Sequence, residues 1–357
     1  MKWQEKIGMQ VSEMAVEYLL KEANVPIKYR VMTELCDEGS SPEIEMLKHE
    51  LEKTERAKQL MEYLIKRKEY HGATLYAAEN SLNMLVDMGF AYKKGFFAFD
   101  RAVEELEQEA KHRKRDDEHL LRFLPNIVIV PFLLRTGMRE SWMVEFVKER
   151  IDIIYDFVQQ KDYDIYLKTE DYKGMPPSFS NRPVIRYELC ENGQIKLPLE
   201  YDIHAFSFLY KELPGEYRNK VDEILVYILH GKFQQIVDGY GIISDGKKYW
   251  ALGWDPKPTN LKIEYKNNPL LLKMELLSNF RIAVESEWFC QALKIIENYK
   301  TTDGRFYYPG NYLTEKNSCW ILGNHMGLGE NRRQKQAICI EGTYRTQKIF
   351  KNIEKLK

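Results

Sequence analysis

The sequence predicts an all-α fold in which an inner ring of helices, closed or incomplete, is wrapped by an outer ring. Helices that are apolar on nearly all sides alternate along the chain with charged helices that carry one apolar stripe. A helix of the first kind must be buried, whereas one of the second kind can face water. The expected inner helices begin at Ala73, Glu118, Tyr201, Pro269 and Arg332, and the expected outer helices begin at Phe99, Trp142, Asn219 and Glu287.

Length and composition favour one large folded domain. The chain has 357 residues, of which 44% are hydrophobic and 30% charged, as is normal for a folded soluble protein. Because no linker-like stretch interrupts the chain, we expect a single helical-repeat domain over residues 1–357. Residues 1–70 would form N-terminal helices, and residues 71–357 would form the hairpins of inner and outer helices.

Charge, hydropathy and cysteine usage argue against several classes of protein. The formal net charge is -1, so the chain has no bulk positive field that would attract nucleic acid or an anionic membrane. The segment Met1–Glu5 has no apolar signal core, and no run of 18 apolar residues occurs. The five scattered cysteines lack a CxxC pair and suit reduced thiols. We therefore expect a cytoplasmic protein that binds neither nucleic acid nor membrane.

The first third of the chain reads as four helices. Gln10–Glu22 is amphipathic, and Pro26 begins a second helix that continues to Leu35. Ser41 is a candidate N-cap for a long charged helix over Pro42–Tyr70. A His-Gly pair then breaks the pattern, and Ala73–Met88 is less charged, which predicts a more buried helix.

The middle of the chain contains its most apolar stretch, Glu118–Thr136. Within it, Ile127–Phe132 could be a strand, but the helical context on both sides favours a buried helix that its prolines would kink. Phe99–Lys111 and Trp142–Gln160 are the amphipathic helices on either side, the second capped by Ser141. The remaining expected helices are Tyr201–Leu213, Asn219–Val237, Pro269–Ala283, Glu287–Tyr299 and Arg332–Asn352.

Three long loops predict which end of the ring holds a site. Lys161–Glu200, Tyr240–Asn268 and Thr302–Asn331 each connect an outer helix to the next inner one. In a ring of hairpins such loops share one face with the N-termini of the inner helices, which favour anions. With 23 Tyr, 16 Phe and 6 Trp, many of them in loops, we expect an aromatic-lined cavity, although aromatic residues covering a core would look the same.

Paired helices and Asp-Gly turns carry a family resemblance. Asp238-Gly239 and Asp303-Gly304 follow expected outer helices, and Thr302–Phe306 is similar to the turn found in repeats of terpenoid cyclases and protein prenyltransferases. The chain thus resembles the α/α toroid of those enzymes. More closely, it resembles a group of uncharacterised bacterial proteins with that toroid, through Val25–Arg30 near one end and Asn331–Arg333 followed by Glu341–Thr343 near the other.

The activity motifs of those enzymes are missing from this chain. Protonating triterpene cyclases use an Asp-x-Asp-Asp acid, which neither Asp162–Asp164 nor Asp116-Asp117 completes. Protein prenyltransferases hold zinc with an Asp two residues before a Cys, and no Asp precedes any cysteine here in that way. The resemblance therefore implies the toroid fold and no particular activity.

One loop gathers residues with metal-binding chemistry. Cys319 and His325 share it with Glu315 and Glu330, and thiolate, imidazole and carboxylate can all bind zinc. A Cys-x5-His pair is not a recognised ligand spacing, however. We therefore expect neither a metal nor a cofactor, and a loop in which Cys319 and Trp320 pack inward while His325 is exposed.

A carboxylate in the last inner helix is a candidate acid or base. Glu341 lies in an apolar stretch, with Arg345 four residues on along the same face. A carboxylate there must be paired, or its pKa must rise. Glu341 could therefore act as a general acid or base facing the cavity, or form an ion pair that fixes the last helix; the second alternative is favoured.

Basic and aromatic loop residues are candidate ligand-binding groups. Arg332 and Arg333, expected to start the last helix, could hold a phosphate or carboxylate together with Arg305, or instead pair with Glu315 or Glu330. Trp254 and Asp255 would suit a sugar or a cation. Asp202, beside His204, could be the N-cap of its helix.

We predict a protein that binds a small or extended ligand, such as a small molecule or an oligosaccharide, in an aromatic-lined central cavity. One alternative is an enzyme that acts on a prenyl-diphosphate-like or carbohydrate substrate by acid–base chemistry. A scaffold that docks another protein is the other alternative. The catalytic candidates are Glu341, His325 and Tyr308, and the ligand-binding candidates are Arg332, Arg333, Arg345, Trp254, Asp255 and Trp320.

Overall fold

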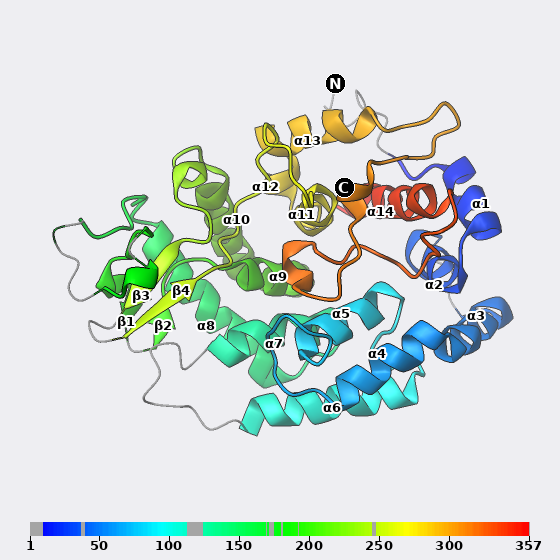
Figure 1. Cartoon of the computed structure of the whole chain (residues 1–357), viewed down its shortest axis with the longest axis horizontal. Helices are drawn as coiled ribbons and strands as arrows, with labels where there is room; N and C mark the ends of the chain where they lie inside the picture. Colours follow the sequence, from blue (N-terminus) through cyan, green and yellow to red (C-terminus); the bar gives the residue numbers. More distant parts are fainter. Residues whose placement is uncertain are drawn as a thin grey trace. The chain divides into compact units, whose positions relative to one another are not determined.

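A computed structural model describes residues 10–36, 40–112, 124–168, 170, 175–179, 181–191, 193–244 and 248–356 of the chain. Over these residues the protein is mostly helical, with fourteen α-helices and two small antiparallel hairpins (Figure 1). The expected helical class is therefore confirmed. No helix among these residues is both long enough and apolar enough to span a membrane.

The chain divides into two compact units. Unit 1 comprises Met1–Glu105, Arg135–Gly137 and Thr259–Lys357, and unit 2 comprises Leu106–Leu134 and Met138–Pro258. The helices are α1 (Glu13–Glu22), α2 (Val25–Arg30), α3 (Pro42–Lys53), α4 (Glu55–Ile65), α5 (Ala78–Asp87), α6 (Phe97–His112), α7 (Leu124–Arg135), α8 (Ser141–Val158), α9 (Glu200–Leu209), α10 (Gly215–Leu229), α11 (Leu270–Leu277), α12 (Arg281–Val284), α13 (Glu287–Glu297) and α14 (Ala337–Glu354).

Buried and half-exposed helices alternate as the sequence predicts. Nine of the ten residues of α5, eight of the ten of α9 and thirteen of the eighteen of α14 are buried. By contrast, seven of the eighteen residues of α8, five of the fifteen of α10 and four of the eleven of α13 are buried. The second group has one apolar stripe per helix, which is the pattern of a helix that also faces water.

The expected single helix over Pro42–Tyr70 is wrong, because it breaks into α3 and α4. The break is at Thr54, whose backbone is extended at ψ 139° and whose hydroxyl accepts a hydrogen bond from the Ala57 amide at 3.3 Å. A threonine hydroxyl that caps the following turn competes with continuation of the helix. The preceding helix has the cap expected from sequence, since Ser41 accepts from the Ile44 amide at 3.2 Å.

Helix α5 begins at Ala78, five residues later than expected. The side-chain amide nitrogen of Asn80 donates to the carbonyl oxygens of Gly72 at 2.9 Å and Thr74 at 2.7 Å, which holds the preceding segment in an irregular turn. The last helix is also late. It begins at Ala337, after turns over residues 331–336, and not at Arg332. At both places polar side chains or turns replace the first helical turn.

The most apolar stretch is a helix, as predicted, and not a strand. Within α7 the residues 127–134 are all buried, and Pro131 lies inside the helix. The beginning of the expected Glu118–Thr136 helix lies outside the described residues.

Two short hairpins lie in the segments expected to be irregular. Strand β1 (Cys190–Glu191) pairs with β2 (Gln194–Ile195), and β3 (Gly241–Ser244) pairs with β4 (Tyr249–Leu252). Gly241 has φ +118°, and a Cβ there would lie 2.4 Å from the carbonyl oxygen of Pro183. This close approach requires glycine.

Candidate functional site

In unit 1, a buried carboxylate at the end of α5 organises a group of arginines. Asp87 is 1% exposed and accepts hydrogen bonds from Trp320 Nε1 and Arg135 Nη2, both at 2.7 Å. Arg345 Nη2 lies 3.8 Å away, and Arg30 Nη1 donates to the Asp87 carbonyl oxygen at 2.8 Å. Burial alone would raise the pKa of the Asp87 carboxyl, but these arginines outweigh it and lower that pKa.

Trp320 fixes the loop of residues 314–330 to this group. Its backbone amide donates to the Asn80 side-chain oxygen at 3.0 Å. The Arg135 guanidinium lies over the indole ring, 4.4 Å from its centroid. The expected inward packing of Trp320 is therefore seen, and its surroundings are charged as well as apolar.

A second group of charges joins α2 to α14. Glu34 lies in the π-helical turn Val31–Leu35 that follows α2. Its carboxylate pairs with Arg30 at 2.7 Å and Lys348 at 2.6 Å, and accepts from the Tyr344 hydroxyl at 3.0 Å. These cations lower the pKa of Glu34 despite its partial burial. The segment that follows α2 is thus held to α14 by compensated, partly buried charge.

Glu341 is buried in α14 and faces the backbone of the loop. Its Oε1 accepts from the amides of Leu328 at 2.6 Å and Glu330 at 3.3 Å, and its Oε2 forms an ion pair with Arg332. Burial raises the pKa of Glu341 to about 7, which the lowering effect of Arg332 only partly offsets. The ion pair that the sequence favours at Glu341 is therefore present, and its partner is the loop residue Arg332, not Arg345.

Arg345 has other partners because it points toward α11. Its Nη1 pairs with Glu275 at 2.8 Å, and its Nε donates to the Met326 carbonyl oxygen at 3.1 Å. The spacing of four residues thus does not predict an ion pair here, because backbone amides and a loop arginine surround the Glu341 carboxylate.

The three arginines expected to share an anion have different partners. Arg332 also pairs with Glu315 at 3.5 Å, as the alternative prediction had it. Arg305 pairs with Asp303 and lies over the Tyr18 ring at 4.8 Å. Arg333 is exposed.

His325 is buried, whereas the sequence predicted an exposed side chain. It is 4% exposed, and its Nδ1 lies 3.0 Å from the Lys316 carbonyl oxygen. Burial lowers the pKa of His325 to about 4, so the ring is neutral at pH 7. Among the residues that the structure describes, no three His, Cys, Asp or Glu side chains gather as a metal site would require.

Tyr308 lies in a buried aromatic group beside α14. Its hydroxyl is 2.8 Å from Thr346 Oγ1, and its ring packs against those of Tyr299 and Tyr312 at 5.1 Å and 5.6 Å. Burial raises its pKa. Gly342 permits this approach, since a Cβ there would lie 2.7 Å from the Tyr308 ring.

The remaining expected residues belong to unit 2, where they organise turns. Trp254 has φ 70°, and its carbonyl oxygen accepts from the Glu200 amide at 2.7 Å. Asp255 accepts from the amides of Gly239 at 2.6 Å and Lys257 at 3.1 Å.

Asp202 is the third residue of α9 and not its N-cap. It accepts from the Leu199 amide at 2.9 Å and pairs with Arg150 at 2.8 Å. Its carboxylate therefore closes the start of the helix from inside the first turn.

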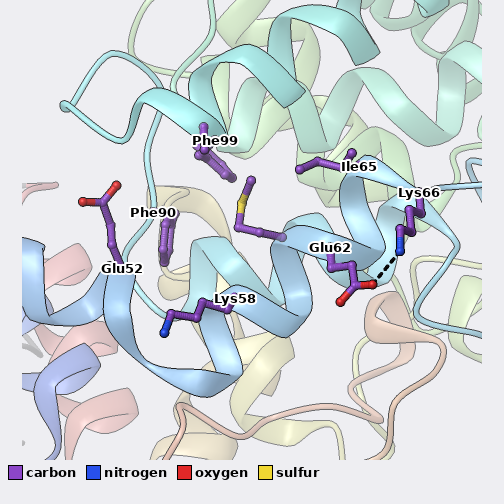
Figure 2. Close-up of a pocket in the computed structure, with 9 residues that line it drawn as sticks. Glu52, Lys58, Glu62, Ile65, Lys66, Phe90 and Phe99 are labelled. Atoms are coloured by element: carbon purple, nitrogen blue, oxygen red, sulfur yellow. Dashed lines mark hydrogen bonds and ion pairs between the residues drawn. The ribbon is translucent and has the colours of Figure 1, made fainter.

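A pocket that the sequence did not predict lies in unit 1 beside α4 and the start of α6 (Figure 2). Its volume is about 430 Å³. Phe90 and Phe99, 3% and 1% exposed, contribute buried rings, and Ile65, 56% exposed, faces the same space. Met61 and Ala98 complete the apolar lining. We call this space the α4–α6 pocket.

Charged side chains surround the α4–α6 pocket. Glu62 and Lys66 form an ion pair at 2.6 Å at its edge, and Glu52 and Lys58 also line it (Figure 2). One signal in the sequence could have indicated the pocket. Met61 and Ile65 are four residues apart and form a second apolar row beside the buried stripe of Leu60 and Leu64.

Comparisons of the chain with protein-family models, with curated proteins and with solved structures found no match. The resemblance to toroid enzymes therefore stays a prediction.

Proposed function

We propose that the protein binds a small apolar ligand in the α4–α6 pocket, with any polar end of the ligand at the charged rim. The observation that carries this proposal is a pocket of about 430 Å³ whose interior is apolar and aromatic. Ligand pockets typically measure roughly 300–1,000 Å³ and have mainly hydrophobic linings with a few polar groups.

The lining favours a flexible chain over a polar ring. The interior groups are two phenyl rings, a thioether and aliphatic carbons, from Phe90, Phe99, Met61, Ile65 and Ala98. Methionine adapts its shape to irregular apolar partners. The lysines and glutamates at the rim balance each other in charge, so selection by net charge is weak. A single acyl or prenyl chain fits this chemistry.

Fluorescence titration with N-phenyl-1-naphthylamine, a neutral apolar probe, tests the proposal, with farnesol and decanoic acid as competitors. Ala98→Trp puts an indole into the pocket and should weaken binding of the probe more than tenfold. The matched control is Phe97→Trp, because Phe97 is the neighbouring residue, is 83% exposed and does not line the pocket. Equal affinity of both variants and wild type would overturn the proposal.

We further propose that the helices are arranged as an α/α toroid, closed or incomplete. The alternation of buried and half-exposed helices along the chain supports it, as do the Asp-Gly turns, in which Gly239 and Gly304 have φ of +74° and +81°. An experimental structure in which α5, α7, α9, α11 and α14 do not form the inner layer would contradict this arrangement.

Acid–base catalysis at Glu341 is a second candidate function. The pKa of about 7 favours it, because a general acid or base works best near the operating pH. The carboxylate is fully buried, so a substrate would have to displace its partner Arg332, whose side chain is 23% exposed. A thermal-shift screen with prenyl diphosphates and oligosaccharides tests this function. If a ligand raises the melting temperature of the wild type, this increase must disappear in Glu341→Gln. An increase that is retained in the variant argues against a functional site at Glu341.

A further inference from the structure

A second pocket lies in unit 2, where α8 ends and α10 ends. Its volume is about 400 Å³. Three of its lining residues carry aromatic rings, namely Tyr163, Tyr227 and His230. Two lysines, Lys161 and Lys232, also line it. The α4–α6 pocket also has two rings and two lysines, but both of its rings are phenyl groups and its Lys66 is paired with Glu62, so the two pockets suit different ligands.

The rings of this second pocket are stacked. The Tyr163 ring is parallel to that of Tyr227, with centroids 4.5 Å apart and 5° between planes. Tyr163 and His230 are also stacked, at 5.0 Å and 22°. Tyr227 is buried whereas His230 is exposed, so this group of rings reaches from the core to the surface.

The inner end of the stack is held firmly. The Tyr227 hydroxyl donates to the Asp162 carbonyl oxygen at 2.5 Å. Phe157 and Phe233 pack edge-on against the Tyr227 ring, with centroids at 5.8 Å and 5.3 Å. The ring system therefore exists before any ligand arrives, which reduces the entropy that binding would cost.

The lysines beside the stack are available to an anion. Lys161 and Lys232 are exposed, and Lys232 Nζ lies 5.9 Å from the centre of the Tyr163 ring. Over the described part of the chain, neither lysine forms an ion pair. The carboxylate of Glu223, which also lines the pocket, accepts a hydrogen bond from Gln159 at 2.5 Å. An incoming anion would thus meet two cations close to an aromatic surface.

We propose that this pocket binds a planar aromatic ring that carries an anionic group, as in a nucleoside monophosphate. The ring extends the stack of Tyr227, Tyr163 and His230, and the anion lies beside Lys161 and Lys232. Stacking on tyrosine accepts any base, since every base has a π-face, so the site selects a planar anion and not one particular base. This inference is independent of the proposed function in unit 1.

Calorimetric titration of the full chain with adenosine 5′-monophosphate tests the inference. Adenosine lacks the anionic group and inorganic phosphate lacks the planar ring, so each of them, titrated separately, should bind at least tenfold more weakly than the nucleotide. Tyr163→Leu removes the central ring and should weaken binding of the nucleotide about tenfold. Lys232→Ala should weaken it by a smaller factor that shrinks as salt is added.

Lys211→Ala is the matched control, because Lys211 is an exposed residue of the same unit that does not line the pocket. Its nucleotide affinity should equal that of wild type. Thermal melting of each variant shows whether it is folded, and Lys232→Ala keeps the test informative if Tyr163→Leu does not fold. The inference is overturned if the wild type does not bind the nucleotide, or if folded Tyr163→Leu and Lys232→Ala bind it as tightly as Lys211→Ala.

Discussion

At the scale of single residues, Glu341 should make the stability of the protein fall as pH rises from about 4.5 to 7. Its pKa is raised to about 7 in the folded chain, from 4.5. Over this window the unfolded chain releases the proton while the folded chain keeps it, so the free energy of unfolding decreases as pH rises. The decrease attributable to Glu341 is on the order of 3 kcal/mol.

The substitution Glu341→Gln removes this titratable carboxyl and so tests whether it causes the pH dependence. Urea unfolding at pH 4.5 and pH 7.5 should show the wild type losing stability relative to the variant at the higher pH. Glu50→Gln, an exposed substitution of the same kind, should follow the wild type. A parallel pH dependence of wild type and Glu341→Gln would show that the carboxyl titrates normally.

His325 should make the protein less stable as pH falls, which is the opposite of the effect of Glu341. Burial lowers its pKa to about 4, from 6.5. Between those values the unfolded chain binds a proton that the folded chain does not, so stability falls as pH decreases from 6.5 to 4. His325→Asn should unfold with a flatter acid limb than the wild type in pH-dependent melting. An unchanged acid limb would mean that the imidazole is accessible to protons in the folded state.

Trp320 is expected to contribute stability through Asp87 more than through size. Trp320→Phe keeps an aromatic ring but removes the hydrogen bond to a buried carboxylate, which should cost about 2 kcal/mol. Tyr307→Phe, at a residue that is 54% exposed, should change the free energy of unfolding by less than about 0.5 kcal/mol. Equal effects of the two substitutions in chemical denaturation would argue against the proposed role of the Asp87 group.

At the scale of elements, the break between α3 and α4 should depend on one hydroxyl. Thr54→Ala removes the cap of α4 and should cost about 1 kcal/mol, whereas Thr54→Ser keeps the oxygen and should cost much less. The measurement is chemical denaturation of the three proteins. Because α4 provides Met61 and Ile65 to the pocket, Thr54→Ala should also weaken binding of the apolar probe.

The apolar periodicity of the sequence predicts where helices lie better than where they end. The run from Ile127 to Phe132 is helical as expected, since its neighbours on both sides favour a helix. Ends were missed where side chains cap or bond to turns, as at Thr54 and Asn80. Each of these hydrogen bonds depends on where a single side-chain oxygen or amide group lies. The spacing of apolar residues in the sequence does not predict that position.

At the scale of the whole molecule, the sequence could predict that some candidate residues are buried, although not His325, and it could not predict their pairing. Glu341, Arg345 and Trp320 were singled out as candidates, and all three lie within one unit with charged partners. The α4–α6 pocket was missed because its rings come from separate elements. Phe90 precedes α6, Phe99 belongs to it, and Ile65 ends α4. Such a pocket forms only when elements far apart in the sequence pack together, and the local sequence pattern does not predict this packing.

The most direct test of the central claim is the methyl NMR spectrum of the protein with labelled methionine, recorded during titration with farnesol. The chain has 13 methionines, and Met61 lines the α4–α6 pocket while Met143 is buried in unit 2. Binding in the α4–α6 pocket predicts a saturable shift of the Met61 signal, assigned with Met61→Leu, and an unchanged Met143 signal. Binding of farnesol that leaves the Met61 signal unmoved would contradict a ligand site in this pocket.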